Sequence, residues 1–394
     1  MKVAVSVHGR FHGFDLAREL QTHGLLSGLL TTYPAFAVRP HVGTDAFLVT
    51  APWLEARRRL CQRLGGICGD VDGAIATAFG KFAAAHLPKD CDLVVGWSSA
   101  AREVIDAAHA RGAMAVVERG STHINHQTDL LTALYQRHGK VFKATSSRII
   151  ERELAEYETA DAVAVPSTFA AETFIKSGVP AEKLLVNPYG VDLRRFTPPD
   201  RRDHEMLRIV FVGRVGLRKG IPELLEAFAP LAGRAELHLV GPLEPSFKVQ
   251  ATAHVTVRGP VAMTALAAEY AAGDIFCLPS WEEGFPLVLL QAMACGLPVV
   301  ASEATGIGDI VTPGREGEIV TAGDVAALTA ALEGLIEDAD LRRAMGQAAR
   351  ARVAEGFDWS SYGIRALGLY EKLLSSPTRV RQEPSPSMRA PGSR

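Results

Sequence analysis

Short runs of β-branched and apolar residues alternate with longer helical patterns along almost the whole chain of 394 residues. This alternation is typical of βαβ units, which build parallel sheets with helices on both faces. Helical patterns cover, for example, residues 14–23, 100–111 and 168–177. The predicted strands are 2–7, 92–96, 114–118, 162–166 and 184–187 in the first half, and 208–212, 236–240, 255–258, 275–278, 298–301 and 318–320 in the second.

The pattern restarts at about residue 208, which predicts two doubly wound domains. Residues 196–203 between the halves hold prolines and charges without apolar periodicity, as linkers do. We expect an N-terminal Rossmann-like domain over residues 1–197 and a C-terminal one over residues 198–375, facing each other across a central crevice. Ligands of such sheets bind beyond the carboxyl ends of the strands, so the chemistry should lie in the loops that follow them.

The last part of the chain divides into a helix and a tail. Apolar residues recur at helical spacing from Trp359 to Leu373, which predicts a final helix that returns toward the first domain. Residues 376–394 hold four prolines, four serines and four arginines against one acidic residue. Such a composition cannot bury enough apolar surface to fold alone, so we expect a disordered tail.

The charge balance excludes whole classes of protein. Lys plus Arg is 42 and Asp plus Glu is 44, so a chain of formal charge −2 has no overall electrostatic footprint for nucleic acid. The five cysteines contain no C-x-x-C pair, which indicates neither a zinc site nor a disulfide framework and fits a reducing cytoplasm. The longest apolar stretch, residues 287–301, is shorter than the ~20 residues a membrane span needs.

One segment leaves membrane contact open. Residues 53–64 form a basic amphipathic helix pattern with Arg57, Arg58 and Arg59 in succession. Such a helix can rest on anionic lipid, which would place the protein at the inner face of a membrane. The alternative is an ordinary solvated helix face.

The strongest signal opens the second half, in what we call the cation loop, residues 213–220. A predicted strand ends at Gly213, and Arg214, Arg218 and Lys219 follow before a helix begins near Pro222. Glycines allow a tight turn, and a helix N-terminus beside cations binds phosphate or diphosphate. The alternative is a solvated cationic loop. The order of residues is not that of a Walker A motif.

The second signal is the acidic loop, residues 279–286. Glu283 is placed to accept hydrogen bonds from sugar hydroxyls, and Gln291 lies two turns up the helix that begins at about Pro286. Together with the cation loop, this stretch resembles glycosyltransferase family 4, whose members have the GT-B fold. Supporting pieces, in the family's order and spacing, are residues 166–169, 189–192 with Phe196, 240–241, 301–302 and 357–359.

The resemblance implies a retaining, metal-independent transferase that uses a nucleotide-diphosphate sugar and needs no cofactor. The C-terminal domain would hold the donor, and the N-terminal domain a glycan, lipid-linked or small-molecule acceptor. The family's paired cations correspond to Arg214 and Lys219, which would stabilise the departing diphosphate, and its first loop glutamate to Glu283. The backbone from Gly213 and from Gly284, Phe285, Pro286 and Leu287 would line the donor, although Pro286 has no N–H to give.

The chain departs from the family pattern at Gln291, where a second glutamate usually grips the ribose. An amide has one accepting oxygen and a donating nitrogen, so ribose binding is either changed or lost. A third reading makes Gln291 a buried structural residue. In the loop of residues 8–15, only Gly13 matches the glycines that approach the donor phosphates.

Two further loops carry open alternatives. His123, after a predicted strand, is a candidate for contact with the donor sugar or a plain loop histidine. Residues 305–309 resemble a donor loop of the family, but a turn with Asp309 as a helix cap fits slightly better.

Three functions fit these features. The first is transfer of a sugar in the assembly of a polysaccharide or lipid-linked glycan. The second is a catalytically silent nucleotide-sugar-binding scaffold, suggested by Gln291. The third is a nucleotide-sugar epimerase of the same architecture, which would convert the donor without an acceptor.

Overall fold

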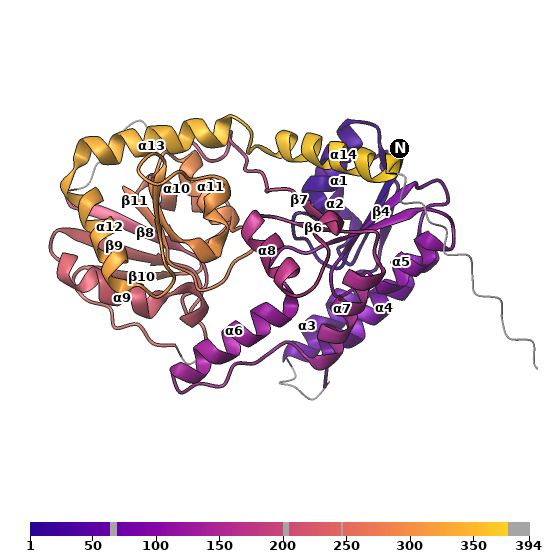
Figure 1. The fold of residues 1–394 in the computed structure, drawn as a ribbon, viewed down its shortest axis with the longest axis horizontal. Helices are drawn as coiled ribbons and strands as arrows, with labels where there is room; N and C mark the ends of the chain where they lie inside the picture. Colours follow the sequence, from indigo (N-terminus) through magenta and orange to yellow (C-terminus); the bar gives the residue numbers. More distant parts are fainter. Residues whose placement is uncertain (64–68, 200–204, 246, 377–394) are drawn as a thin grey trace, which may run out of the picture.

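The computed structural model describes residues 1–63, 69–199, 205–245 and 247–376, which form two parallel sheets with helices on their faces (Figure 1). Residues 377–394 of the predicted tail and residues 200–203 of the predicted linker lie outside these ranges. The first sheet has the order β3-β2-β1-β4-β5-β6-β7 and the second the order β10-β9-β8-β11-β12-β13. Every named pair of neighbouring strands is parallel.

Each predicted strand coincides with an observed one, so the predicted α/β class with two doubly wound domains is confirmed. The strands of the first sheet are β1 (Val3–Val7), β2 (Leu26–Thr31), β3 (Leu48–Thr50), β4 (Leu93–Trp97), β5 (Met114–Glu118), β6 (Ala162–Val165) and β7 (Leu184–Val186). Those of the second are β8 (Leu207–Val212), β9 (Ala235–Val240), β10 (Val255–Gly259), β11 (Ile275–Leu278), β12 (Val299–Ser302) and β13 (Gly317–Val320).

Two strands at one side of the first sheet, β2 and the edge strand β3, were not predicted from the sequence. The β2 segment reads LSGLLT, with one β-branched residue and a glycine in its interior, and β3 has only three residues. Neither carries a local strand signal. Both are strands because β1 offers an open edge to β2, and β2 in turn to β3.

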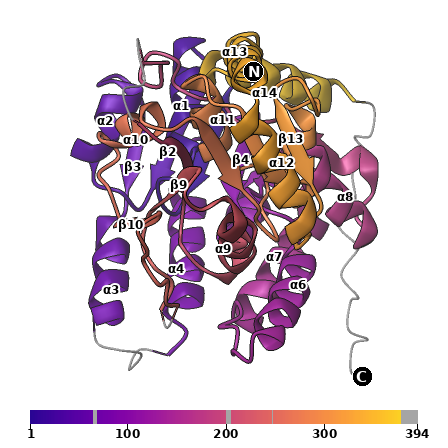
Figure 2. The same cartoon turned by 90° about the vertical axis from the view of Figure 1, so that its left-hand side faces the viewer.

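The helices alternate with the strands as βαβ units require. In the first half they are α1 (Gly13–Thr22), α2 (Ala35–Val42), α3 (Pro52–Arg63), α4 (Val71–His86), α5 (Arg102–His109), α6 (Ile124–Arg137), α7 (Ser147–Thr159) and α8 (Thr168–Lys176). In the second half they are α9 (Ile221–Phe228), α10 (Leu266–Ala271), α11 (Leu287–Ala294), α12 (Val325–Glu337), α13 (Ala339–Ala354) and α14 (Trp359–Ser375). Helices α3, α4, α6 and α7 extend to one side of the molecule (Figures 1 and 2).

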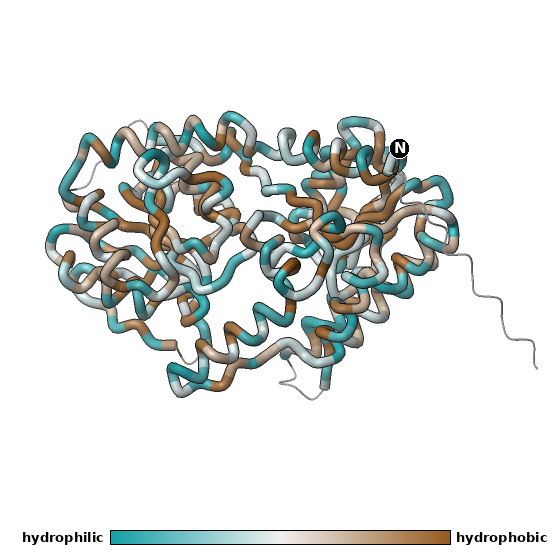
Figure 3. The backbone as a smooth tube through the Cα atoms, viewed as in Figure 1, coloured by the Kyte–Doolittle hydropathy of each residue, from teal (hydrophilic) through white to brown (hydrophobic). Residues whose placement is uncertain are grey.

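Burial on both faces explains why the central strands are apolar throughout. In β1, Val3, Val5 and Val7 pack into one apolar cluster, whereas Ala4 faces another on the opposite side of the sheet. Brown, hydrophobic stretches accordingly run through the interior of both halves, with teal on the surrounding helices (Figure 3).

Two segments join the halves. The predicted final helix, α14, packs against α1 of the first half, and Gly363 allows the close approach because a Cβ atom there would lie 2.5 Å from Cβ of Glu19. Helix α6 extends toward the second half (Figure 1), where Leu131 and Leu134 pack with Leu217 of the cation loop.

Two observations bear on the remaining sequence predictions. The cysteine spacing predicted no disulfide framework, yet Cys61 is disulfide-bonded, whereas Cys91 and Cys277 are free thiols. No helix in the described ranges is both long and apolar enough to cross a bilayer.

Candidate active site

The strand order reverses at β1 and at β8, so the loops after β1, β4, β8 and β11 open at the two switch points where ligands of such sheets bind. The cation loop follows β8, and the acidic loop follows β11. These two loops touch through their backbones. Gly220 has φ +67°, and a Cβ atom there would overlap the carbonyl group of Pro279, so only glycine fits.

The three cations of the loop have different surroundings. Arg214 is exposed and makes no hydrogen bond or ion pair with any described residue. Lys219, in the short turn Leu217–Lys219, forms an ion pair with Glu283. Arg218 is paired with Glu282 at 2.9 Å and lies 3.9 Å from Glu283. The structure therefore brings Lys219 and Glu283, which were predicted separately as a phosphate-binding cation and a sugar contact, into direct contact, and leaves Arg214 exposed after the end of β8.

The backbone of the acidic loop keeps unused donors. The Glu283 N–H donates to the carbonyl oxygen of Ala304 at 2.9 Å. The N–H groups of Gly284 and Phe285, by contrast, have no acceptor within the described part of the chain. Such groups can donate to an anionic or hydroxyl-rich ligand. Phe285 and Pro286 are buried, and Leu287, half-buried, begins α11.

Gln291 is hydrogen-bonded at one end of its amide and lies at a cavity between the two halves. Its Oε1 accepts a 2.9 Å hydrogen bond from the hydroxyl of Tyr270, so the amide nitrogen is the part left to meet a ligand. Gln291 and Leu287 line a cavity of about 580 Å³ between the two halves. That cavity is closed on its other side by Arg10 and Arg18 from around the start of α1. The predicted ribose contact stays a prediction.

The position of Gly13 is set by packing, and its predicted approach to the donor phosphates stays a prediction. Gly13 is buried at the start of α1, where a Cβ atom would lie 3.0 Å from Val7 and 3.1 Å from Trp97. It does not line the crevice cavity, whereas the exposed Arg10 in the same loop does. Sequence reasoning missed Arg10 because a single arginine in a loop carries no signal of its own.

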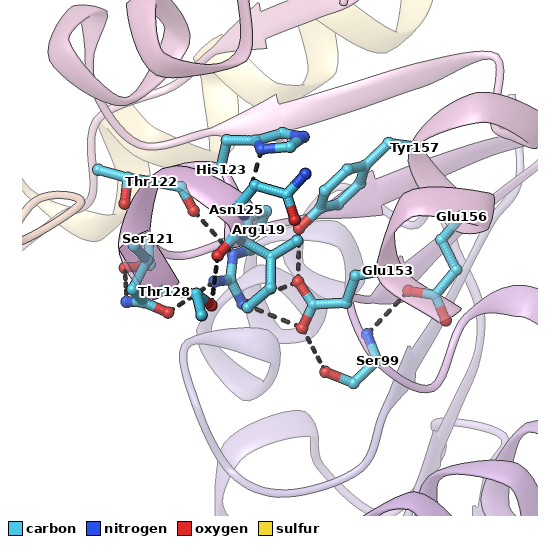
Figure 4. A network of polar contacts seen from close by, with 12 residues as sticks. Ser99, Arg119, Ser121, Thr122, His123, Asn125, Thr128, Glu153, Glu156 and Tyr157 are labelled. Carbon is cyan, nitrogen blue, oxygen red and sulfur yellow. Dashed lines mark hydrogen bonds and ion pairs between the residues drawn. The ribbon is translucent and has the colours of Figure 1, made fainter. Parts of the chain in front are cut away.

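His123 caps α6 and packs inside the first half. Its Nδ1 accepts from the N–H of Asn125 at 3.3 Å, and its ring lies 5.3 Å from that of Tyr157 and 5.0 Å from that of Phe174 (Figure 4). Burial, together with the nearby Arg119, lowers the pKa of His123 to about 4. These contacts favour a structural residue over contact with the donor sugar, which the sequence left as an alternative.

Asp309 does act as a helix cap, but on α8, a predicted helix whose first residue lies 141 positions away and whose contact with Asp309 the sequence does not show. Its Oδ2 accepts from the N–H of Thr168 at 2.6 Å, the first residue of α8 in the other half. Gly306, with φ +68°, makes the turn that brings Asp309 there.

A second cavity, of about 940 Å³, lies within the first half. Its lining includes His8, Thr32, Arg58, Ser99 and Lys143. Thr32 is 2% exposed, yet neither its Oγ1 nor Nδ1 of His8 has a hydrogen-bond partner among the described residues. Buried polar atoms without partners are rare and mark places where a ligand or water belongs.

Ser99 adds strain to this cavity. It has φ +75°, which is unusual for a residue with a side chain. The N–H of Ser99 donates to the carboxylate of Glu156 at 2.8 Å, and the Ser99 hydroxyl donates to that of Glu153 at 2.6 Å (Figure 4). Such a conformation persists only where its surroundings impose it, as at binding sites.

The described residues contain no group of three or more His, Cys, Asp or Glu side chains that could hold a metal ion.

Comparison with known proteins agrees with this fold. Sucrose-phosphate synthase from Thermosynechococcus elongatus superposes with a TM-score of 0.70 at 22% identity, over 94% of this chain and 98% of that one. The Anabaena HepE protein in complex with UDP-glucose superposes with a TM-score of 0.66 at 18% identity, over 94% and 100%. The fold and the opposed loops thus define a two-domain protein of the GT-B class.

The sequence comparisons are more particular. Residues 207–338 match the family described as Glycosyl transferases group 1. MMP alpha-(1->4)-mannosyltransferase of Mycolicibacterium hassiacum is 34% identical over 221 residues, 54% of each chain. A D-inositol 3-phosphate glycosyltransferase of Geodermatophilus obscurus is 30% identical over 292 residues, 67% of this chain and 61% of that one. These matches confirm the resemblance to glycosyltransferase family 4, although the chain spans only a little over half the length of the curated relatives it matches first.

Proposed function

We propose that this protein is a retaining, metal-independent glycosyltransferase that moves a sugar from a nucleotide-diphosphate sugar to a hydroxyl acceptor, in the assembly of a polysaccharide or lipid-linked glycan. The names of the curated relatives support transfer of a sugar. The neighbouring structure solved with UDP-glucose supports a donor of this chemical class.

The observation that carries the proposal is that the cation loop holds both the exposed Arg214, with no ion pair among the described residues, and Lys219, which is paired with Glu283 of the acidic loop. A nucleotide diphosphate gains negative charge as its bond to the sugar breaks, and cations already in place stabilise that charge. Arg214 can bind a phosphate in a bidentate manner without breaking any existing contact. Lys219 would exchange Glu283 for the diphosphate, which frees Glu283 to accept hydrogen bonds from the sugar.

The remaining donor contacts follow from position. Gly284 and Phe285 lie in the same loop as Glu283, and their backbone N–H groups, which have no acceptor among the described residues, would donate to the sugar or its phosphate. Gln291 would donate its amide N–H to a ribose hydroxyl, since Tyr270 occupies its oxygen. Together these contacts orient the donor so that its anomeric carbon faces the first domain.

For the acceptor, the cavity of the first domain supplies unpaired polar groups. The Thr32 hydroxyl and Nδ1 of His8 lack partners, and Val71 and Ile75 give the cavity an apolar part. Hydroxyl groups beside an apolar ring face are the features of a sugar or cyclitol. A polyhydroxylated acceptor would satisfy both unpaired atoms at once.

The test is a thermal-shift screen over UDP, GDP, ADP and CMP sugars, since a ligand that binds only the folded state raises its apparent stability. Product analysis with the stabilising donor, with and without acceptors, then separates the alternatives. Transfer only in the presence of an acceptor supports the proposal. Conversion of the donor alone would indicate an epimerase, and binding without any turnover would indicate a silent scaffold.

A further inference from the structure

A second glutamate of the acidic loop, Glu282, contacts the first domain, whereas its neighbour Glu283 is paired with Lys219. The Glu282 side chain is 0% exposed and sits at the boundary between the two domains. One oxygen accepts from the hydroxyls of Ser121 at 2.8 Å and Thr122 at 2.7 Å. The other accepts from Nε2 of Gln127 at 3.0 Å and is paired with Arg218. Three of these four partners belong to the first domain, and one to the second.

The charge of Glu282 depends on these partners. Burial by itself would raise the pKa of this carboxyl, but Arg218 and the hydrogen bonds from Gln127, Thr122 and Ser121 lower it to about 2. A buried carboxylate is costly unless paired and hydrogen-bonded. Separation of the domains would remove the three neutral donors together, so the contact favours the closed arrangement.

The donors on the first domain are themselves held in place. Arg119 Nη2 donates to Oε1 of Gln127 at 3.0 Å, which directs the amide nitrogen of Gln127 toward Glu282. Arg119 also donates to the carbonyl oxygen of Thr122 at 3.2 Å and is paired with the buried Glu153 at 3.1 Å (Figure 4). Two of the residues that contact Glu282 are therefore also held by contacts within the first domain.

The backbone close to Glu282 also packs against the first domain. A Cβ atom on Gly284 would lie 2.5 Å from the carbonyl oxygen of Gly120 and 2.7 Å from Cα of Ser121. The hydroxyl of Ser167, also in the first domain, donates to the carbonyl oxygen of Gly284 at 2.6 Å. Polar contacts and close backbone packing thus occur together at one point of the acidic loop.

On its own domain Glu282 acts through Arg218. The Nε of Arg218 donates to the carbonyl oxygen of Glu282 at 3.1 Å, and the N–H of Trp281 donates to that of Arg218 at 2.9 Å. Arg218 precedes Lys219 directly. Glu282 therefore positions Arg218, the residue next to the proposed phosphate-binding Lys219.

We propose that Glu282 is a positioning residue that locks the two domains against each other and, through Arg218, fixes the cation loop relative to the acidic loop. The effect on turnover rests on the proposed function, whereas the effect on domain closure does not. The residue lies outside the positions that resemble the family's donor contacts.

The test uses the full chain with Glu282→Gln, which keeps the size and removes the charge, and Thr122→Val, which removes one donor of the first domain. Thr128→Val is the matched control, because the Thr128 hydroxyl donates only to its own helix, at Ile124. Small-angle X-ray scattering reports domain closure without any substrate. We expect a larger radius of gyration for both test variants and no change for the control.

The same variants separate positioning from binding. With UDP and GDP as probes, calorimetry should give dissociation constants within about threefold of wild type, while turnover falls at least about tenfold. The double variant that combines Glu282→Gln with Thr122→Val should have the same radius of gyration as Glu282→Gln alone, since both changes remove the same contact between the domains. If Glu282→Gln is not folded by circular dichroism, Thr122→Val and Gln127→Ala carry the test.

Scattering curves of folded Glu282→Gln or Thr122→Val that superpose on wild type would overturn the proposal. If no donor gives a product, the proposed function fails, but the scattering result still decides whether Glu282 locks the domains.

Discussion

Lys219 and Glu283 form an ion pair between the loops that follow β8 and β11. Both side chains are mostly shielded from water, at 17% and 13% exposure. Arg214, in the same loop as Lys219, is exposed and has no ion pair among the described residues, so the cation loop offers one unpaired cation and one whose anionic partner can be exchanged. A diphosphate can replace that partner at Lys219.

Removal of either cation should abolish most of the transfer. We expect Arg214→Ala and Lys219→Ala each to lower kcat about 10²- to 10³-fold, because each removes a charge aimed at the leaving diphosphate. Steady-state kinetics with the identified donor measures this. Arg234→Ala is the control, since Arg234 pairs only with exposed Glu333 and Glu337. Near-normal turnover in either test variant would refute the assignment of the cation loop.

A carboxylate at position 291 should strengthen the grip on the donor. In Gln291→Glu, one oxygen would still accept from Tyr270 and the second would be free for ribose. We expect the donor KM to fall about tenfold, the effect of one added charge-assisted hydrogen bond. Gln347→Glu on the exposed face of α13 is the control. An unchanged KM would mean that residue 291 does not meet the ribose.

Thr32→Val should separate stability from acceptor binding. The Thr32 hydroxyl is buried without a partner, so its loss should leave the free energy of unfolding unchanged or raise it by about 1 kcal/mol. The same change should raise the acceptor KM about 5- to 30-fold and leave the donor KM unaltered. Urea unfolding measures the effect on stability, and steady-state kinetics measures the effect on the two KM values. A variant that is less stable but kinetically normal would speak against an acceptor at this cavity.

Stability should depend on the protonation of His123. Its pKa is about 4 in the folded chain against an ordinary 6.5, so the unfolded chain binds the proton more readily. The contribution of His123 is therefore fully present above pH 6.5 and is lost as the pH falls toward 4.

His123→Asn keeps an N-cap acceptor without a titrating ring. We expect wild type to lose about 1–3 kcal/mol of unfolding free energy relative to this variant between pH 6.5 and 4. Urea unfolding across this range measures the difference. Parallel pH profiles for the two proteins would contradict a buried, neutral His123.

Helix α3 should bind anionic membranes through one face. Trp53 and Leu60 are 57% and 58% exposed. Arg57 is exposed one turn from Trp53 on the same face, and Arg59 is exposed on another side of the helix, where it is paired with Glu55 at 3.0 Å. Arg58 is half-buried, lines the first-domain cavity and is paired with Glu55 at 2.6 Å, a partner that it shares with Arg59.

We expect the protein to float with vesicles that contain phosphatidylserine, and the double variant Arg57→Glu, Arg59→Glu to lose this binding. Arg234→Glu with Arg315→Glu, two exposed positions of the second domain, controls for net charge. Equal flotation of the two double variants would exclude α3 as the contact.

The sequence alone determined the two parallel sheets and the loops that carry the site. Apolar runs such as 208–212 and 275–278 are local signals, because strands buried on both faces must be apolar throughout. Glycines and charges after those strands predicted the cation and acidic loops for the same local reason.

Only the tertiary structure decided which side chains meet. Glu282 and Glu283 are neighbours of one type, yet one faces Ser121 and Thr122, some 160 positions away, and the other faces Lys219. The partner of Gln291, the buried place of His123 and the unpaired hydroxyl of Thr32 are equally invisible in the sequence. Such pairings depend on how the two domains pack, and packing brings together residues whose sequence separation carries no pattern.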